Sequence, residues 1–139
     1  MSQTPTVEGT DTPSPYSPNQ DASSVTLYVT LATLRGCSIQ NLCDESHLTG
    51  ALRDACQRAQ FTELQISVKT FEPEGSGVTG VAIIGESHVA IHTWPEHGSL
   101  FLDIASCSTY ESTQRALEAV QDAFPGSTLV RRDDIIHES

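Results

Sequence analysis

The chain has 139 residues, about the size of one ordinary domain, and we predict a single domain over residues 24–139 behind a disordered tail at residues 1–23. Its longest aliphatic run, Val81-Ala82-Ile83-Ile84, is far shorter than the roughly 20 residues that span a bilayer, which excludes a transmembrane helix. Eighteen acidic residues against seven basic ones give a net charge of −11, which argues against nucleic acid or an anionic membrane as partner and favours a cationic small molecule.

The first 23 residues are rich in Pro, Ser and Thr and carry almost no apolar side chains. Such a segment buries too little surface to offset its ordering entropy, so the composition predicts disorder. The N-terminus also lacks the basic and apolar segments of a secretion signal, and we therefore expect a cytoplasmic protein. Four cysteines at spacings that match no zinc motif are then expected to be reduced: Cys37, Cys43, Cys56 and Cys107.

Alternating apolar and polar residues at 25–33 predict a half-buried first strand. Asp44 is a candidate N-cap for a helix that runs to about Ala59. Its apolar positions recur every three or four residues, as expected for a helix with one buried face: Leu48, Ala51, Leu52, Ala55 and Cys56.

Four further strands are predicted at residues 62–71, 78–84, 88–94 and 99–105, separated by turn-forming residues. A second helix is predicted to begin at Ser108, where Ser108 and Glu111 have the spacing of a capping box. It ends at Pro125-Gly126, and its apolar stripe comprises Ala116, Leu117, Val120 and Phe124. A last strand is predicted at residues 127–132, before an acidic tail.

This order of elements, β-α-β-β-β-β-α-β, predicts an α+β fold. Short links make the middle strands antiparallel, and two amphipathic helices cover one face of the sheet to form a two-layer sandwich. Few residues are left to cover the other face. We expect that face to be partly exposed or covered by a partner subunit.

Chemically versatile side chains are densest at residues 85–98. If 88–94 is a strand, its side chains alternate between the two faces. One set is apolar or small and suits a core: Val89, Ile91 and Thr93. The other set, which comprises His88, Ala90, His92 and Trp94, is expected on the face that the helices leave uncovered.

Three general interpretations fit this face. A metal site could use His88, His92 and His97 with Glu96 or Asp103, but residues four apart on a strand are about 13 Å apart, too far to share one ion. A hydrolase could use Ser87 and His92, but Val89 stands where the G-x-S-x-G motif needs its second glycine. The third interpretation is an interface in a dimeric, non-enzymatic binding protein.

Residues 80–98, followed by Asp103 and Cys107, closely resemble prokaryotic S-adenosylmethionine decarboxylase. Their sequence is Gly80-Val-Ala-Ile-Ile-Gly-Glu-Ser-His-Val-Ala-Ile-His-Thr-Trp-Pro-Glu-His-Gly98. The upstream segments Phe71-x-Pro73-x-Gly75 and Gly77-Val-Thr-Gly80 are similar to the family's approach to this motif. Members of the family cleave themselves at the Glu-Ser bond and carry a pyruvoyl group in place of PLP.

The resemblance implies that Ser87 Oγ attacks the carbonyl carbon of Glu86 and converts the peptide bond into an ester. β-Elimination then releases a β chain that ends at residue 86. Tautomerisation and loss of ammonia leave a pyruvoyl group at position 87, the first residue of the α chain. By the same resemblance, His92 acts in processing and Thr79, in the position of a serine, assists it.

In turnover, the resemblance implies that the pyruvoyl carbonyl forms a Schiff base with the substrate amine and accepts electrons after CO₂ leaves. Cys107 matches the family's proton donor. Phe71 and Trp94 match positions near the substrate, where aromatic faces suit an adenine ring and a sulfonium, and Glu96 matches a carboxylate that could accept hydrogen bonds from ribose hydroxyls. The product is the aminopropyl donor for spermidine and other polyamines. Dimers in which both subunits contribute to each site are also implied.

The first strand departs from the family pattern, because residues 25–33 contain neither a Gly-x-His stretch nor an acidic residue. Relatives of this fold decarboxylate arginine or ornithine, which are also cationic. An arginine or ornithine decarboxylase on the same scaffold therefore remains an alternative, as does the non-enzymatic binding protein.

Overall fold

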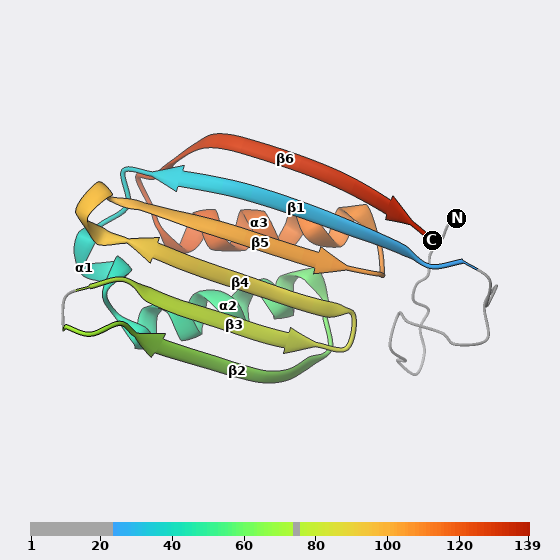
Figure 1. Ribbon diagram of the computed structural model, residues 1–139, viewed down its shortest axis with the longest axis horizontal. Coiled ribbons are helices and arrows are strands. Elements are labelled where there is room, and N and C mark those ends of the chain that lie inside the picture. The colour runs from blue at the N-terminus through green and yellow to red at the C-terminus, as the bar shows by residue number, and fades with distance from the viewer. Residues whose placement is uncertain (1–23, 74–75) are drawn as a thin grey trace.

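The structure, a computed structural model, describes residues 24–73 and 76–139. Within them, six antiparallel strands form one sheet, and two long helices pack against one of its faces (Figure 1). The predicted α+β two-layer sandwich is therefore confirmed. The prediction of a disordered tail at residues 1–23 lies outside the described residues.

The strands are β1 (Thr26–Arg35), β2 (Glu63–Thr70), β3 (Val78–Ile84), β4 (Ser87–Trp94), β5 (Ser99–Ser106) and β6 (Thr128–Glu138). The helices are α1 (Ile39–Leu42), α2 (Glu45–Ala59), α3 (Tyr110–Ala123) and the short 3₁₀ helix η1 (Pro95–His97). Across the sheet the order is β2-β3-β4-β5-β1-β6. The predicted order of elements is confirmed, apart from α1, whose four residues are too few to give a periodic pattern.

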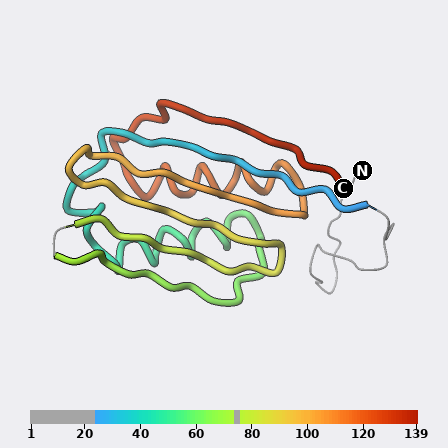
Figure 2. The backbone as a smooth tube through the Cα atoms, in the orientation of Figure 1, coloured from blue at the N-terminus to red at the C-terminus, as the bar shows by residue number. Residues whose placement is uncertain are grey.

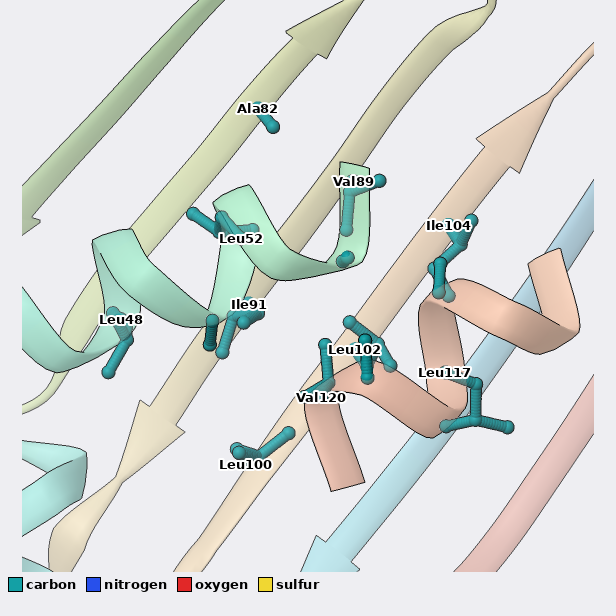
Figure 3. Packing of buried hydrophobic residues seen from close by; sticks show 14 of the residues in the cluster. Leu48, Leu52, Ala82, Val89, Ile91, Leu100, Leu102, Ile104, Leu117 and Val120 are labelled. Carbon is teal, nitrogen blue, oxygen red and sulfur yellow. The ribbon is translucent and has the colours of Figure 1, made fainter. Parts of the chain in front are cut away.

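Helix α2 begins where the sequence predicted. The carboxylate of Asp44 accepts hydrogen bonds from the backbone N–H groups of Ser46 and His47, which would otherwise lack partners in the first turn. All five predicted core positions of this helix are buried. Leu48 and Leu52 face strand residues such as Ala82, Val89 and Ile91, and Leu117 and Val120 of α3 extend the same core (Figure 3).

The start of α3 differs from the prediction. Its N-cap is Thr109, whose hydroxyl accepts a hydrogen bond from the Ser112 N–H at 3.1 Å. The hydroxyl of Ser108 instead contacts those of Ser106 and Ser112. Because Thr109 still has extended backbone angles, the helix begins later than the capping box at Ser108 predicted.

The last strand is longer than predicted. It continues through the charged residues 131–134 to Glu138 and pairs with β1 along nearly its whole length. Successive side chains of the strand point to opposite faces, so each arginine lies beside an aspartate two residues later. Arg131 pairs with Asp133 on one face and Arg132 pairs with Asp134 on the other, each at 2.9 Å. Charged side chains are common on an edge strand, where they discourage pairing with other chains.

The two ends of the sheet carry different connections (Figures 1 and 2). The turn end holds the β3–β4 turn and the end of β5, which leads into α3. The loop end holds the β2–β3 and β4–β5 connections. On the side away from the helices, the uncovered face exposes apolar side chains from four strands: Leu31, Ile83, Phe101 and Ile135.

Within the described part of the chain, none of the helices is both long enough and apolar enough to cross a membrane.

Candidate functional site

The residue before β4, Glu86, is buried in the β3–β4 turn with only 2% of its surface exposed. One oxygen of its carboxylate accepts a hydrogen bond from the Thr62 N–H at 3.0 Å, and the other accepts one from the Thr62 hydroxyl at 3.0 Å. Thr62 lies in the connection between α2 and β2. The side chain of Glu86 is therefore anchored to a segment 24 positions away in sequence.

The carbonyl oxygen of Glu86 accepts a hydrogen bond from the backbone N–H of Cys107 at 3.1 Å. The register of β4 with β5 explains this contact, because Ser87 pairs with Ser106 and Cys107 follows at once. Such a donor polarises a carbonyl group and stabilises negative charge that develops on its oxygen. A hydrogen bond of this kind would favour attack at the carbonyl carbon of Glu86.

Ser87 has a backbone φ of +152°, a conformation that residues with a Cβ rarely adopt. Holding a residue other than glycine there costs about 1–3 kcal/mol, and such strain concentrates at functional sites. The peptide bond between Glu86 and Ser87 thus joins a fixed carbonyl to a strained residue.

Cys107 is half-buried just after β5. Burial, and then the negative charge of Glu86, raise the pKa of its thiol, so the thiol keeps its proton at neutral pH and can donate it. Cys37 and Cys56 belong to the hydrophobic core. Burial raises the pKa of Cys56 to about 11, which agrees with the interpretation of these two residues as buried hydrophobic side chains.

A second group of side chains lies on the uncovered face, toward the loop end. Thr79 is directly opposite His92 in the β3–β4 ladder, and Thr79 Oγ1 lies 3.4 Å from His92 Nδ1. The ring of Trp94 packs on that of Phe101 with centroids 4.4 Å apart, and His92 lies next to them at 6.4 Å from Trp94. The strand parity expected for His92 and Trp94 is therefore observed.

The other two predicted substrate contacts are also at the loop end. Phe71 follows β2 and is exposed, and its N–H donates to the carbonyl oxygen of Gly77 at 2.9 Å. Glu96 is exposed in η1. The structure thus groups Glu86, Ser87 and Cys107 at the turn end, and it groups Thr79, His92 and Trp94 nearer the loop end together with Phe71 and Glu96.

Within one chain these groups do not meet. Ser87 and His92 are both in β4 and five residues apart, which at about 3.3 Å per residue separates their backbones by about 16–17 Å. A histidine side chain does not span that distance. The predicted partnership of Ser87 and His92 therefore cannot form inside a single subunit.

His88, on the uncovered face, lies 3.3 Å from Asp103 (Nε2 to Oδ1) rather than near His92. Among the described residues, no group of three or more His, Cys, Asp or Glu side chains is placed to hold a metal ion.

Sequence reasoning missed two residues of these groups. Phe101 could have been found, because aligning the β4–β5 hairpin places it directly opposite His92. Thr62 gives no such signal: it lies outside the motif, and only the folded chain brings it to Glu86.

Comparison with known proteins gives a consistent result. The model of the family described as S-adenosylmethionine decarboxylase matches residues 28–133. An S-adenosylmethionine decarboxylase proenzyme from Synechococcus sp. (strain WH7803) is 37% identical over 89 residues, which cover 64% of this chain and 68% of that protein. The proenzyme of the same name from Thermodesulfovibrio yellowstonii is 31% identical over 113 residues, covering 78% of this chain and 82% of that protein.

Among solved structures, the adenosylmethionine decarboxylase of Aquifex aeolicus VF5 superimposes with a TM-score of 0.67 at 28% sequence identity. The match covers 82% of this chain and 89% of that one. The sheet and the helices described above are therefore shared with the solved structure of an adenosylmethionine decarboxylase.

Proposed function

The chain belongs to the S-adenosylmethionine decarboxylase family, and from this premise we propose that it is a self-cleaving decarboxylase of S-adenosylmethionine that uses a pyruvoyl group made from Ser87. The observation that carries the proposal is the Glu86–Ser87 bond itself, with the carbonyl of Glu86 held by the Cys107 N–H and Ser87 at a φ of +152°. The hydrogen bond continues the β4–β5 ladder, whereas a turn with no chemical role has no need of the strained backbone at Ser87.

Self-cleavage begins when Ser87 Oγ attacks the carbonyl carbon of Glu86. The C–N bond breaks, the nitrogen of Ser87 becomes a free amine, and an ester joins the two residues. Loss of the Cα proton of Ser87 then breaks the ester and releases Glu86 with a main-chain carboxylate, the new C-terminus. Position 87 is left as dehydroalanine, which takes up water and releases ammonia to give the pyruvoyl group. The products are a β chain of residues 1–86 and an α chain beginning at 87.

The residues at the turn end favour the first of these steps. Negative charge develops on the Glu86 oxygen during attack, and the Cys107 N–H, 3.1 Å away, stabilises it. Strain at Ser87 raises the free energy of the uncleaved chain relative to the ester, in which the rigid peptide unit is gone. Together they offset the unfavourable exchange of an amide for an ester.

A base that activates the Ser87 hydroxyl must come from elsewhere, because His92 of the same chain is about 16–17 Å away along the strand. We propose a homodimer in which the uncovered faces of two subunits meet. A two-fold axis there exchanges the ends of the two β4 strands, which brings His92 and Thr79 of one subunit to Ser87 of the other. The exposed apolar residues on this face, including Phe101 and Ile135, favour the same pairing.

In the mature enzyme, the pyruvoyl group supplies an electron sink for the electron pair left behind when CO₂ departs. Cys107 then donates a proton to the substrate α-carbon. The thiol suits this role because burial and the charge of Glu86 raise its pKa and keep it protonated. Its half-buried position beside Glu86, next to the proposed cleavage bond, supports this role.

In this dimer, the loop-end residues of one subunit bind the substrate that reacts at position 87 of the other. The aromatic faces of Phe71 and Trp94 suit an adenine ring and a sulfonium cation, and the carboxylate of Glu96 accepts hydrogen bonds from ribose hydroxyls. The net charge of −11 attracts a substrate with a net positive charge. Decarboxylation yields an aminopropyl donor for spermidine synthesis. A cytoplasmic location agrees with the free thiols of Cys37, Cys56 and Cys107.

Denaturing mass spectrometry of the purified protein tests this proposal. We expect two fragments that join between Glu86 and Ser87, the second with no free amino group. Release of labelled CO₂ from carboxyl-labelled S-adenosylmethionine, arginine and ornithine, measured side by side, identifies the substrate, and we expect release from the first alone. An intact chain without activity overturns the proposal, and faster release from arginine or ornithine overturns the substrate.

A further inference from the structure

Thr62 makes three hydrogen bonds to the two residues that precede the proposed cleavage bond. Its N–H and hydroxyl each donate to one carboxylate oxygen of Glu86 at 3.0 Å, and its carbonyl oxygen accepts from the Gly85 N–H at 2.8 Å. We propose that Thr62 is a positioning residue for self-cleavage, which holds the Glu86 carbonyl in the orientation that Ser87 attacks. This inference rests on the proposed function.

The burial of Glu86 makes this contact strong. Its side chain is almost fully removed from water, and a carboxylate in such a place needs hydrogen bonds or an opposite charge. Among the residues that the structure describes, no ion pair involves Glu86, and both of its carboxylate oxygens accept from Thr62. Without the hydroxyl of Thr62, one oxygen loses its donor and the side chain is driven toward solvent.

Gly85 allows Thr62 to approach this closely. A Cβ at position 85 would lie 3.2 Å from the Cβ of Thr62, closer than such atoms normally pack. The bond from the Gly85 N–H to the Thr62 carbonyl oxygen depends on this close approach. The α2–β2 connection and the β3–β4 turn are therefore fitted to each other at this point.

The peptide that is to be cleaved is thus held from two sides. Thr62 fixes the Gly85 backbone and the Glu86 side chain, while the Cys107 N–H fixes the Glu86 carbonyl oxygen. Rotation of the Glu86–Ser87 peptide plane would break the bond to the Cys107 N–H, and the Thr62 contacts fix the Gly85 backbone and the Glu86 side chain from which that plane extends. Because a misplacement of about 1 Å in the reacting geometry can lower a rate about 100-fold, loss of the Thr62 hydroxyl acts on the rate of cleavage.

The first experiment follows cleavage of freshly synthesised protein over time, by gel and mass spectrometry, in Thr62→Val and Thr62→Ser. Valine keeps the shape of threonine and the backbone N–H but removes the hydroxyl, and we expect cleavage to slow by about ten- to a hundredfold, as for loss of a hydrogen bond to a charged group. Serine restores the hydroxyl, and we expect a rate within about threefold of wild type.

Thr30→Val is the matched control. Thr30 is also a buried threonine whose hydroxyl donates to a carboxylate, Asp134 Oδ1 at 2.7 Å. It lies in β1, where it contacts β6 and α3 and not the β3–β4 turn. We expect Thr30→Val to lower the melting temperature and leave the rate of cleavage unchanged. Slowing of both valine variants in proportion to their loss of stability would mean that Thr62 only stabilises the fold, which overturns the inference.

A second variant tests the same contact from its other side and does not depend on the folding of Thr62→Val. Glu86→Gln removes the negative charge that accepts both hydrogen bonds from Thr62, and we expect cleavage to slow by a comparable factor. In the double variant, Thr62→Val is expected to add little, because the carboxylate is already absent. Wild-type cleavage of Glu86→Gln, or fully additive effects, overturns the inference. A wild-type chain that does not cleave refutes the proposed function instead.

Discussion

The backbone N–H of Cys107 donates a hydrogen bond to the carbonyl oxygen of Glu86 across 3.1 Å. This contact places one residue in both steps of the proposed chemistry. In this proposal, the main chain of Cys107 stabilises the carbonyl oxygen of the bond that is broken during maturation, and its thiol donates a proton during turnover. The two roles use different atoms, so substitution of the side chain separates them.

Cys107→Ala retains the backbone N–H, and we expect it to cleave itself at close to the wild-type rate. Decarboxylation should fall by about 10²–10⁴-fold, the usual contribution of a general acid. Both are measured on one preparation, cleavage by mass spectrometry and turnover by CO₂ release. Cys107→Ser, with a less acidic donor, should lie between alanine and wild type, and undiminished turnover in Cys107→Ala would remove the thiol from its role.

Mixed dimers test the origin of the base. Ser87→Ala lacks the proposed nucleophile and His92→Ala lacks the proposed base, so neither variant alone should cleave. When differently tagged copies are produced together, a dimer with one of each holds one complete site. We expect the His92→Ala chain to be cleaved in this mixture, because its Ser87 meets His92 of the partner subunit.

The tags identify which chain is cut, and this is the control. The Ser87→Ala chain must remain intact in every mixture, since it has no hydroxyl to react. Absence of cleavage in dimers shown by tandem affinity purification to contain both chains would contradict the shared site.

Strain at Ser87 predicts a difference in stability between two variants that do not cleave. Glycine adopts positive φ without a penalty, whereas alanine keeps a Cβ at the φ of +152° observed here. We expect Ser87→Gly to be more stable than Ser87→Ala by about 1 kcal/mol in urea unfolding, although glycine normally destabilises a strand. If Ser87→Ala proves the more stable of the two, the backbone is not strained at this position.

Stability should fall in alkaline solution. Burial raises the pKa of Cys56 to about 11, from 9.0 for an ordinary thiol. Because the folded thiol holds its proton more tightly, the free energy of unfolding is intact below about pH 9 and decreases as the pH rises toward 11. Between pH 7.5 and 10.5, Cys56→Ala should lose about 2 kcal/mol less than wild type. Equal losses would show that Cys56 titrates normally.

Two glycine substitutions should have opposite effects. A Cβ at Gly77 would lie 2.3 Å from the carbonyl oxygen of Thr93 and 3.8 Å from the ring of Phe71, so Gly77→Ala should destabilise the fold by about 3 kcal/mol and raise the KM. Gly50 lies in α2, where an added methyl group would meet no atom within 4 Å, and Gly50→Ala should stabilise by about 0.5–1 kcal/mol. Thermal unfolding and steady-state kinetics measure both.

Local sequence patterns predicted those helices and strands in which apolar residues recur at regular spacing. Helix α2 followed from Asp44 and the spacing of Leu48 and Leu52, and β4 followed from strict alternation around His92. Placing His92 and Trp94 on the uncovered face needed only this alternation. The catalytic roles came from resemblance to a family motif, since neither spacing nor composition indicates that a peptide bond is itself a reactant.

Other features depend on contacts between distant residues, and local patterns do not encode them. The acidic residues after 132 suggest a tail, yet pairing with β1 and two ion pairs extend the strand to Glu138. Thr62 reaches Glu86 only after α2 and β3 pack together. The distance between Ser87 and His92 likewise became significant once both were placed in a single straight strand.

The strand order gives the cut molecule an unusual architecture. The β chain would hold β1, β2 and β3, and the α chain would hold β4, β5 and β6, yet β1 lies between β5 and β6 in the sheet. The two polypeptides are thus interleaved and not merely side by side. Separating them would require breaking the pairing of β1 with both β5 and β6, so self-cleavage would cut the backbone and leave both chains within one sheet.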